Sequence, residues 1–150
     1  MEINNTIREQ VISDLKAGLI TETGDSMVAT FFRGNPAFIA VPEFEDEEDN
    51  ESDIPAVAVS ISEGQSVDED FEEITWRSIL TIRIYLVDKN NVDQELDALG
   101  EEVLKVITKH YTANGLLDLC NRHSFDYARD EEQPWGTLDL AFNIEYTEEV

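Results

Sequence analysis

Acidic side chains are concentrated in two blocks, and this distribution limits where the chain can place a core. The chain has 34 Asp and Glu against 10 Lys and Arg, a formal net charge of -24. Eight of the eleven residues at 43–53 are acidic. The second block, residues 63–73, contains six acids, Glu63, Asp68, Glu69, Asp70, Glu72 and Glu73. Because unpaired carboxylates are costly to bury, both blocks must face water, counter-ions or a basic partner.

The rest of the chain has enough apolar material for a core. Apolar residues make up 41% of the 150 residues, which predicts one domain over residues 1–150. Cys120 is the single cysteine, so no intrachain disulfide can form. The N-terminal segment lacks the pattern of a signal peptide, and no apolar run is long enough to span a bilayer. We therefore expect a soluble protein made in the cytoplasm, without a membrane partner.

Two segments have the hydrophobic period of a helix. The first is predicted over residues 6–19, where Thr6 and Glu9 have the spacing of a capping box. Its apolar face is Ile7, Val11, Ile12, Leu15 and Leu19. The second helix is predicted to begin at Asn91 and to end near Gly115, since Asn is a good N-cap and Gly a good C-terminal stop. Its apolar stripe is Leu96, Leu99, Val103, Val106 and Ile107.

Apolar runs with a period of two predict strands between and after the helices. We expect strands at residues 27–32, 37–41, 55–61, 76–87, 124–129 and 137–146, the first two forming a hairpin or a bent strand. The clearest alternation places Leu138, Leu140, Phe142, Ile144 and Tyr146 on one face. The predicted fold class is α+β, a mostly antiparallel sheet with two main helices packed on one face and with acidic loop insertions.

Several cationic and aromatic residues are candidates for a protein interface. Arg77 and Arg83 lie on the polar face of the 76–87 strand and need acidic partners, for which we consider a neighbouring subunit. Arg129 is flanked by acids, and Trp135 follows in a predicted turn. These side chains either pair within their own chain or form binding hot spots, where Trp, Tyr and Arg are enriched. The sequence leaves both readings open.

Motifs for the common catalytic and metal-binding sites are absent. The chain has no G-x-S-x-G, no Gly-rich phosphate loop, no H-E-x-x-H and no Cys/His metal spacing. His110, His123 and Cys120 are read as structural residues. The 43–53 block does not fit a calcium loop, because Gly and the closing Glu are missing from their positions. We expect that the chain is not an enzyme. Loose binding of Mg²⁺ or Ca²⁺ by clustered acids at a subunit junction stays open as an alternative.

Short segments, taken in order, resemble a known family. They are Ala-Thr-Phe-Phe-x-Gly-x-Pro-Ala at 29–37, Pro-Ala-Val-Ala-Val at 55–59, Glu-Leu-Asp-Ala at 95–98, Asp-Tyr-x-Arg-Asp at 126–130, then Trp135 and the strand at 138–146. With this order and spacing the chain resembles the tail terminator of lambda-like long-tailed phages, the minor tail protein U family. Residues 43–53 are longer and more acidic than the corresponding connection of the lambda protein.

The resemblance implies a structural role in the virion tail. It implies a hexameric ring on the head-proximal end of the tail tube, which ends tube polymerisation and provides the head-joining surface. The implied partners are further copies of the chain, the tail tube protein and a head-completion protein, with DNA passing through the ring without specific binding. No cofactor is required on this view, and loosely bound Mg²⁺ would assist oligomerisation.

On this reading the candidate residues fall into two groups. The first is a subunit or tube interface of Arg77, Arg83, Asp126, Tyr127, Arg129, Asp130 and Trp135. The second is a mobile acidic loop containing Glu63, Asp68, Glu69, Asp70, Glu72 and Glu73. Two other functions compete: an acidic DNA mimic that binds a basic host factor, which the charge alone suggests, and a metal-dependent hydrolase that uses the clustered acids.

Overall fold

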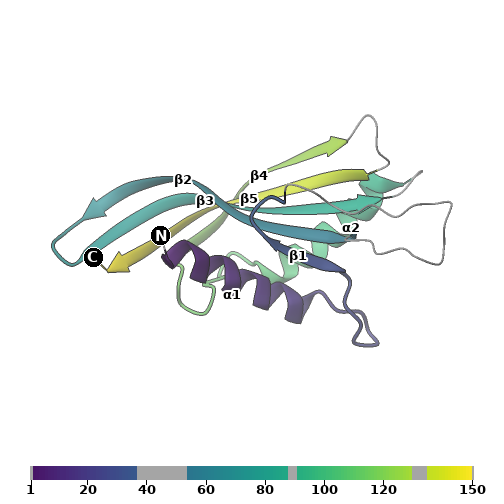
Figure 1. Cartoon of the computed structure of the whole chain (residues 1–150), viewed down its shortest axis with the longest axis horizontal. Helices are drawn as coiled ribbons and strands as arrows, with labels where there is room; N and C mark the ends of the chain where they lie inside the picture. Colours follow the sequence, from purple (N-terminus) through teal and green to yellow (C-terminus); the bar gives the residue numbers. More distant parts are fainter. Residues whose placement is uncertain (1, 37–53, 88–90, 130–134, 150) are drawn as a thin grey trace.

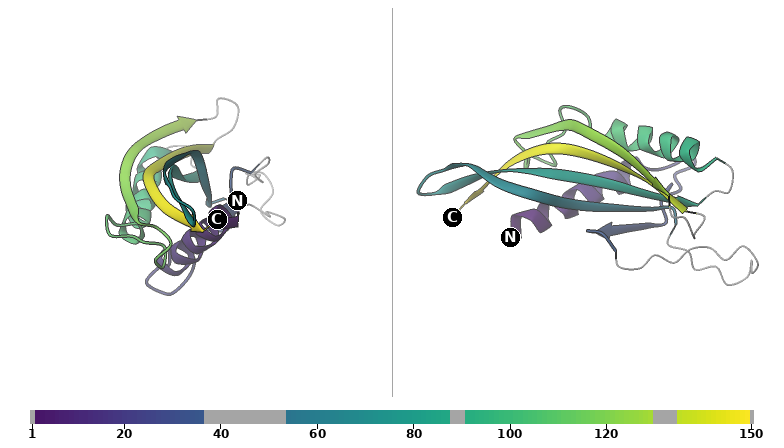
Figure 2. Two further views of the ribbon diagram at one scale, coloured as in Figure 1. Left: turned by 90° about the vertical axis from the view of Figure 1, so that its left-hand side faces the viewer. Right: turned by 90° about the horizontal axis from the view of Figure 1, so that it is seen from above.

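Two helices and five strands make up the part of the chain that the computed structural model describes, residues 2–36, 54–87, 91–129 and 135–149. In chain order they are α1 (Glu2–Gly18), β1 (Thr30–Arg33), β2 (Ala56–Glu69), β3 (Glu73–Val87), α2 (Val92–Val106), β4 (Leu119–Arg129) and β5 (Trp135–Glu149). The strands form one long, twisted sheet in the order β1-β2-β3-β5-β4, as Figures 1 and 2 show.

The core lies between the two helices and one face of the sheet. The helices contribute Ile7, Val11, Ile12, Leu15, Val92, Leu96, Leu99 and Val103. The strands contribute Val57, Val59, Leu80, Ile82, Ile84, Leu86, Leu138, Leu140, Phe142, Ile144 and Tyr146. These strand residues occur at every second position, so the predicted face of β5 is confirmed, and β2 and β3 bury alternate residues in the same way.

The predicted fold class is wrong about the sheet, which is mixed. β1 runs parallel to β2, with Thr30 opposite Ala56 and Arg33 opposite Val59, while the other three pairings are antiparallel. Parallel neighbours need a crossover connection of about a dozen residues or more. The segment between β1 and β2 is long enough for this, whereas we expected residues 27–32 to continue into residues 37–41 as a hairpin or a bent strand. The predicted strand at 37–41 and the acidic block at 43–53 lie outside the described residues.

The second acidic block is also not a loop insertion, because it forms the end of a β-hairpin. β2 pairs with β3 as far as Glu69 opposite Ile74. Asp70 caps the turn: its Oδ1 accepts hydrogen bonds from the backbone N–H groups of Glu72 and Glu73, both at 2.8 Å. The carboxylates stay exposed while the backbone is paired. A high density of acidic residues is therefore compatible with a paired strand and did not justify predicting a loop.

Both helices have boundaries that differ from those predicted. Thr6 is not the N-cap of α1, which already begins at Glu2, and the Thr6 hydroxyl donates to the Glu2 carbonyl at 3.1 Å inside the helix. α2 begins after Asn91, as predicted, but ends at Val106. The next residue, Ile107, is fully buried and has left the helical conformation at φ -95 and ψ 79. Ile107 thus belongs to the predicted apolar stripe and is buried, although the helix has already ended.

Candidate functional site

A groove separates α2 from the edge strand β4. Phe125 lies opposite Leu140 and Tyr127 opposite Leu138, so both aromatic side chains are on the helix-covered face of the sheet. A register shift between Arg122 and Ser124 brings Arg122, opposite Phe142, onto the same face. Phe125 is 69% exposed and Tyr127 41% exposed, because α2 covers this edge of the sheet incompletely.

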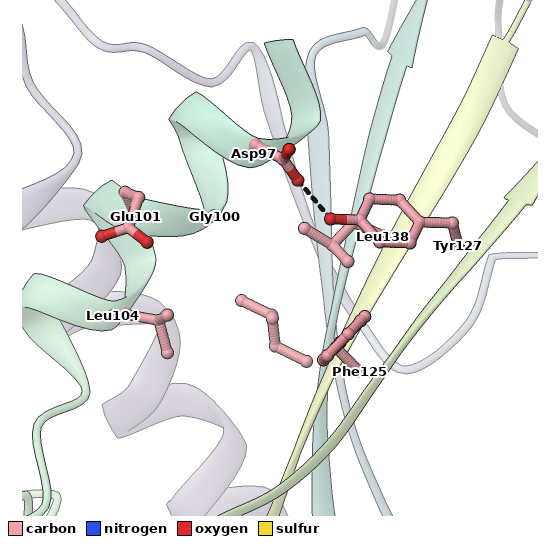
Figure 3. Close-up of a pocket in the computed structure, with 8 residues that line it drawn as sticks. Asp97, Gly100, Glu101, Leu104, Phe125, Tyr127 and Leu138 are labelled. Atoms are coloured by element: carbon pink, nitrogen blue, oxygen red, sulfur yellow. Dashed lines mark hydrogen bonds between the residues drawn. The ribbon is translucent and has the colours of Figure 1, made fainter. Parts of the chain in front are cut away.

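Acidic side chains of α2 hold the upper part of this groove together. The Tyr127 hydroxyl donates a hydrogen bond to the Asp97 carboxylate, as Figure 3 shows. This bond to a carboxylate raises the pKa of Tyr127. One turn earlier on α2, Asp93 Oδ1 lies 3.7 Å from Arg129 Nη2. Two of the predicted interface residues therefore face the chain's own second helix.

The groove has two adjoining hollows on either side of Phe125. The upper hollow, of about 290 Å³, is drawn in Figure 3 and is lined by Asp97, Gly100, Glu101, Leu104, Phe125, Tyr127, Leu138 and Leu140. The lower hollow, of about 240 Å³, is lined by Leu104, Arg122, His123, Ser124, Phe125, Leu140, Ala141 and Phe142. We call both together the α2–β4 groove. Its walls are mostly apolar, with acids at the upper rim and Arg122 and His123 at the lower rim.

Arg77 and Arg83 lie on the opposite, outer face of the sheet and have partners within the chain. Arg83 binds Asp139 through two hydrogen bonds, Nε to Oδ1 at 2.6 Å and Nη2 to Oδ2 at 2.8 Å. Arg77 Nη2 donates to Glu145 Oε1 at 2.8 Å. Each acid is the direct cross-strand neighbour of its arginine on β5. The hydrogen bonds that Arg83 donates to Asp139 raise the pKa of Arg83 above its ordinary value.

Trp135 is the first residue of β5 and not part of a turn. Its ring centroid lies 5.8 Å from that of Tyr85, at an interplanar angle of 51°. Together with Phe32, Ala56 and Ala58 these rings form a small apolar cluster on the outer face. Asp126 lies on this face too, opposite Asp139, and Asp130 is outside the described residues. The predicted interface residues are thus divided between two faces, and their interface roles stay predictions.

His123 and Cys120 are two of the residues that the sequence suggested were structural. His123 Nδ1 lies 3.3 Å from the Asn143 side-chain nitrogen, and Cys120 is buried, which raises the pKa of its thiol to about 11. Within the described ranges no cluster of three or more His, Cys, Asp or Glu could hold a metal ion. None of the helices described is both long and apolar enough to cross a membrane.

One exposed residue that the sequence reasoning did not single out is Phe71. It lies at the tip of the β2–β3 hairpin and is fully exposed. β4 begins at Leu119, which pairs with Glu145 on β5, and Glu145 pairs with Arg77 on β3. Because β3 begins four residues before Arg77, at Glu73, the β2–β3 hairpin extends past the start of β4. Figure 1 shows this hairpin projecting beyond both helices. The signal was present in the sequence, since Phe71 is the one apolar residue in the run from Asp68 to Glu73.

Comparisons with known proteins cover nearly the whole chain. Residues 2–146 match the family described as phage minor tail protein U. A tail tube terminator protein of Escherichia phage N15 is 29% identical over 142 residues, which are 93% of this chain and 95% of that protein. A tail tube terminator protein of Escherichia phage lambda is 31% identical over 120 residues, 79% of this chain and 83% of that protein.

Proposed function

The chain belongs to the phage minor tail protein U family, and from this premise we propose that it acts as one tail-terminator domain. The observation that carries the proposal is the family match over residues 2–146, together with relatives that are named tail tube terminator proteins. The protein is a structural component of the virion tail, made in the host cytoplasm, and its task requires no catalysis. It binds the end of the tail tube and stops its growth.

The active assembly in this proposal is a ring of six copies on the head-proximal end of the tube. The ring has one surface for the tube protein and another for a head-completion protein. DNA passes through its centre without specific binding, which the formal charge of -24 favours because carboxylates repel phosphates. The same charge opposes contact between free copies, so binding to the tube end supplies the free energy that closes the ring.

Among the predicted interface residues, Arg129 and Trp135 are best suited to meet another subunit. The contact of Arg129 with Asp93 is long, at 3.7 Å, and both side chains are exposed, so little is lost when Arg129 changes partner. Arg83, by contrast, is held by two short hydrogen bonds to Asp139. Trp135 keeps part of its ring uncovered on the outer face. We therefore assign Arg77 and Arg83 a smaller share of the interface.

Ring formation can be tested with the purified chain. We expect negative-stain images and native mass measurements to show rings with a central hole at rising protein concentration, and more of them with millimolar Mg²⁺. The chain should also stop the growth of tubes assembled from the tube protein. Continued tube growth contradicts the terminator role. A monomer or dimer that binds a basic host protein, without rings, would favour the DNA mimic.

A further inference from the structure

We propose that the hairpin tip of one copy inserts Phe71 into the lower hollow of the α2–β4 groove of a second copy. The inference rests on the proposed function, because it requires copies of the chain to associate. It specifies that the hairpin tip and the α2–β4 groove are the two surfaces in contact and that Phe71 is the anchoring residue.

The hairpin tip presents Phe71 as a preformed anchor. The ring is fully exposed. Burying a Phe side chain is favourable by about 1.5–3 kcal/mol of free energy. The turn below it is held by three hydrogen bonds: two to Asp70 Oδ1, and one from the Asp70 N–H to the Glu73 carbonyl at 2.9 Å. Because the turn is already ordered, docking costs little conformational entropy.

The lower hollow has room and chemistry for this ring. Its volume is about 240 Å³, and its walls include Leu104, Phe125, Leu140 and Phe142. A cavity of about 150 Å³ with similar apolar walls binds benzene, which has the size of a Phe ring. Phe125, itself 69% exposed, would be covered by the incoming ring. Both partners would thus remove apolar surface from water.

Charge selects the lower hollow over the upper one. The tip carries Glu69, Asp70 and Glu72 beside Phe71, and the upper rim is acidic at Asp97 and Glu101. The lower rim instead offers Arg122 and His123. Arg122 makes no ion pair within the described ranges. An acidic tip therefore repels the upper rim and is attracted to the lower one.

The contact has to form between copies. In the sheet Ile82 pairs with Leu140, which pairs with Phe125. Ile82 comes eleven positions after Phe71 in the chain. At about 3.3 Å per residue this is roughly 35 Å of strand, so the tip cannot reach its own groove. Tip and groove are different surfaces, so the same contact can repeat from one copy to the next, head to tail. Such contacts generate rings when the rotation closes.

Disulfide trapping tests the contact directly and leaves Phe71 in place. In a Cys120→Ala background, one chain carries Glu72→Cys and a second, differently tagged chain carries Arg122→Cys. We expect the mixed disulfide to form at least tenfold faster than with a chain carrying Ile20→Cys, an exposed apolar site outside the groove. Adding Phe71→Ala to the Glu72→Cys chain should abolish that advantage. Equal rates for the Arg122 and Ile20 positions overturn the inference.

Assembly measurements give a second, independent readout. Phe71→Ala should raise the protein concentration at half-assembly at least tenfold, while Ile20→Ala leaves it unchanged. Circular dichroism checks that both variants fold, which we expect because both side chains are exposed. If the unmodified chain forms rings but the two cysteine variants form no mixed disulfide, this contact is overturned and the proposed function still stands. A mixed disulfide in open chains of subunits supports the contact and contradicts the ring.

Discussion

At the scale of single residues, cross-strand position decides what each charged side chain does. Arg77 and Arg83 are both on the outer face of β3 and both bind a half-buried acid, yet Arg77 makes one hydrogen bond and Arg83, the less exposed arginine, makes two. Asp70 uses its carboxylate on the backbone of its own turn. The acidic residues thus have distinct local roles despite their similar chemistry.

The two arginines are expected to differ in their effect on stability. Arg83→Ala should lower the free energy of unfolding by about 1–2 kcal/mol, because it removes a two-bond charged contact made by an arginine that is only 33% exposed. Arg77→Ala is the matched control and should cost less than about 0.5 kcal/mol, since Arg77 is 57% exposed. Urea denaturation of both variants measures the difference. Equal costs would contradict the reading.

The turn at Asp70 should respond to acid. The backbone N–H groups of Glu72 and Glu73 hold the pKa of Asp70 below its ordinary value of 3.8. Because the folded pKa is the lower one, the stabilisation of the turn is complete above the ordinary pKa and is lost as the pH falls through the folded pKa. The amide proton shifts of Glu72 and Glu73, followed by NMR, should titrate with a midpoint below 3.8.

A matched variant separates this titration from those of neighbouring acids. Asp70→Asn keeps a side-chain oxygen that can accept the same hydrogen bonds but cannot ionise in this range. The low-pH change in the two amide shifts should disappear in this variant. A midpoint at or above the ordinary value in the unmodified chain would refute the assigned role of Asp70.

At the scale of elements, the hairpin and the two helices determine the outline of the molecule. β2 and β3 continue well past the start of β4, so the acidic tip projects while the core stays under α1 and α2. The helices meet closely where α1 ends, because a Cβ on Gly18 would lie 2.3 Å from Val106 Cγ2. A small residue is therefore required at this crossing.

The close contact predicts the outcome of enlarging Gly18. Although Ala has the higher helix propensity, Gly18→Ala should destabilise the fold by about 1–3 kcal/mol, because the added methyl overlaps the side chain of Val106. Combining it with Val106→Ala removes the overlapping methyl groups. The double variant should be less destabilised than the sum of the two single changes. Additive costs in thermal or urea unfolding would show that the helices can move apart freely.

At the scale of the whole molecule, net charge sets the conditions for association. A formal charge of -24 produces repulsion between copies that extends over about a Debye length, roughly 10 Å at 0.1 M salt. The short-range contacts proposed for Phe71, Arg129 and Trp135 have to overcome this repulsion. Assembly is therefore expected to depend on ionic conditions as well as on protein concentration.

Salt should promote association. Raising NaCl from about 50 to 300 mM should lower the protein concentration at which rings form, because screening reduces the repulsion between copies. At matched ionic strength MgCl₂ should act more strongly than NaCl if Mg²⁺ binds between acidic groups. Analytical ultracentrifugation measures both effects. Association that weakens as NaCl rises would indicate that ion pairs, rather than overall repulsion, dominate the contact.

The sequence by itself determined which face of each core strand is buried and which segments cannot enter the core. Alternation in β3 and β5 and the charge of residues 63–73 are local properties, since a side chain's face follows from its position along its own strand. The family was also readable from the order of short segments, and the match over residues 2–146 confirmed it.

Only the tertiary structure decided the pairing of strands and everything that depends on it. The parallel direction of β1, the partners of Arg77 and Arg83 on β5, and the groove between α2 and β4 each join residues far apart in the chain. A strand pattern carries no information about which neighbour it meets or in which register, because those choices depend on the packing of the whole core. For this reason the exposure of Phe71 and the α2–β4 groove, on which the proposed contact rests, became visible only in the fold.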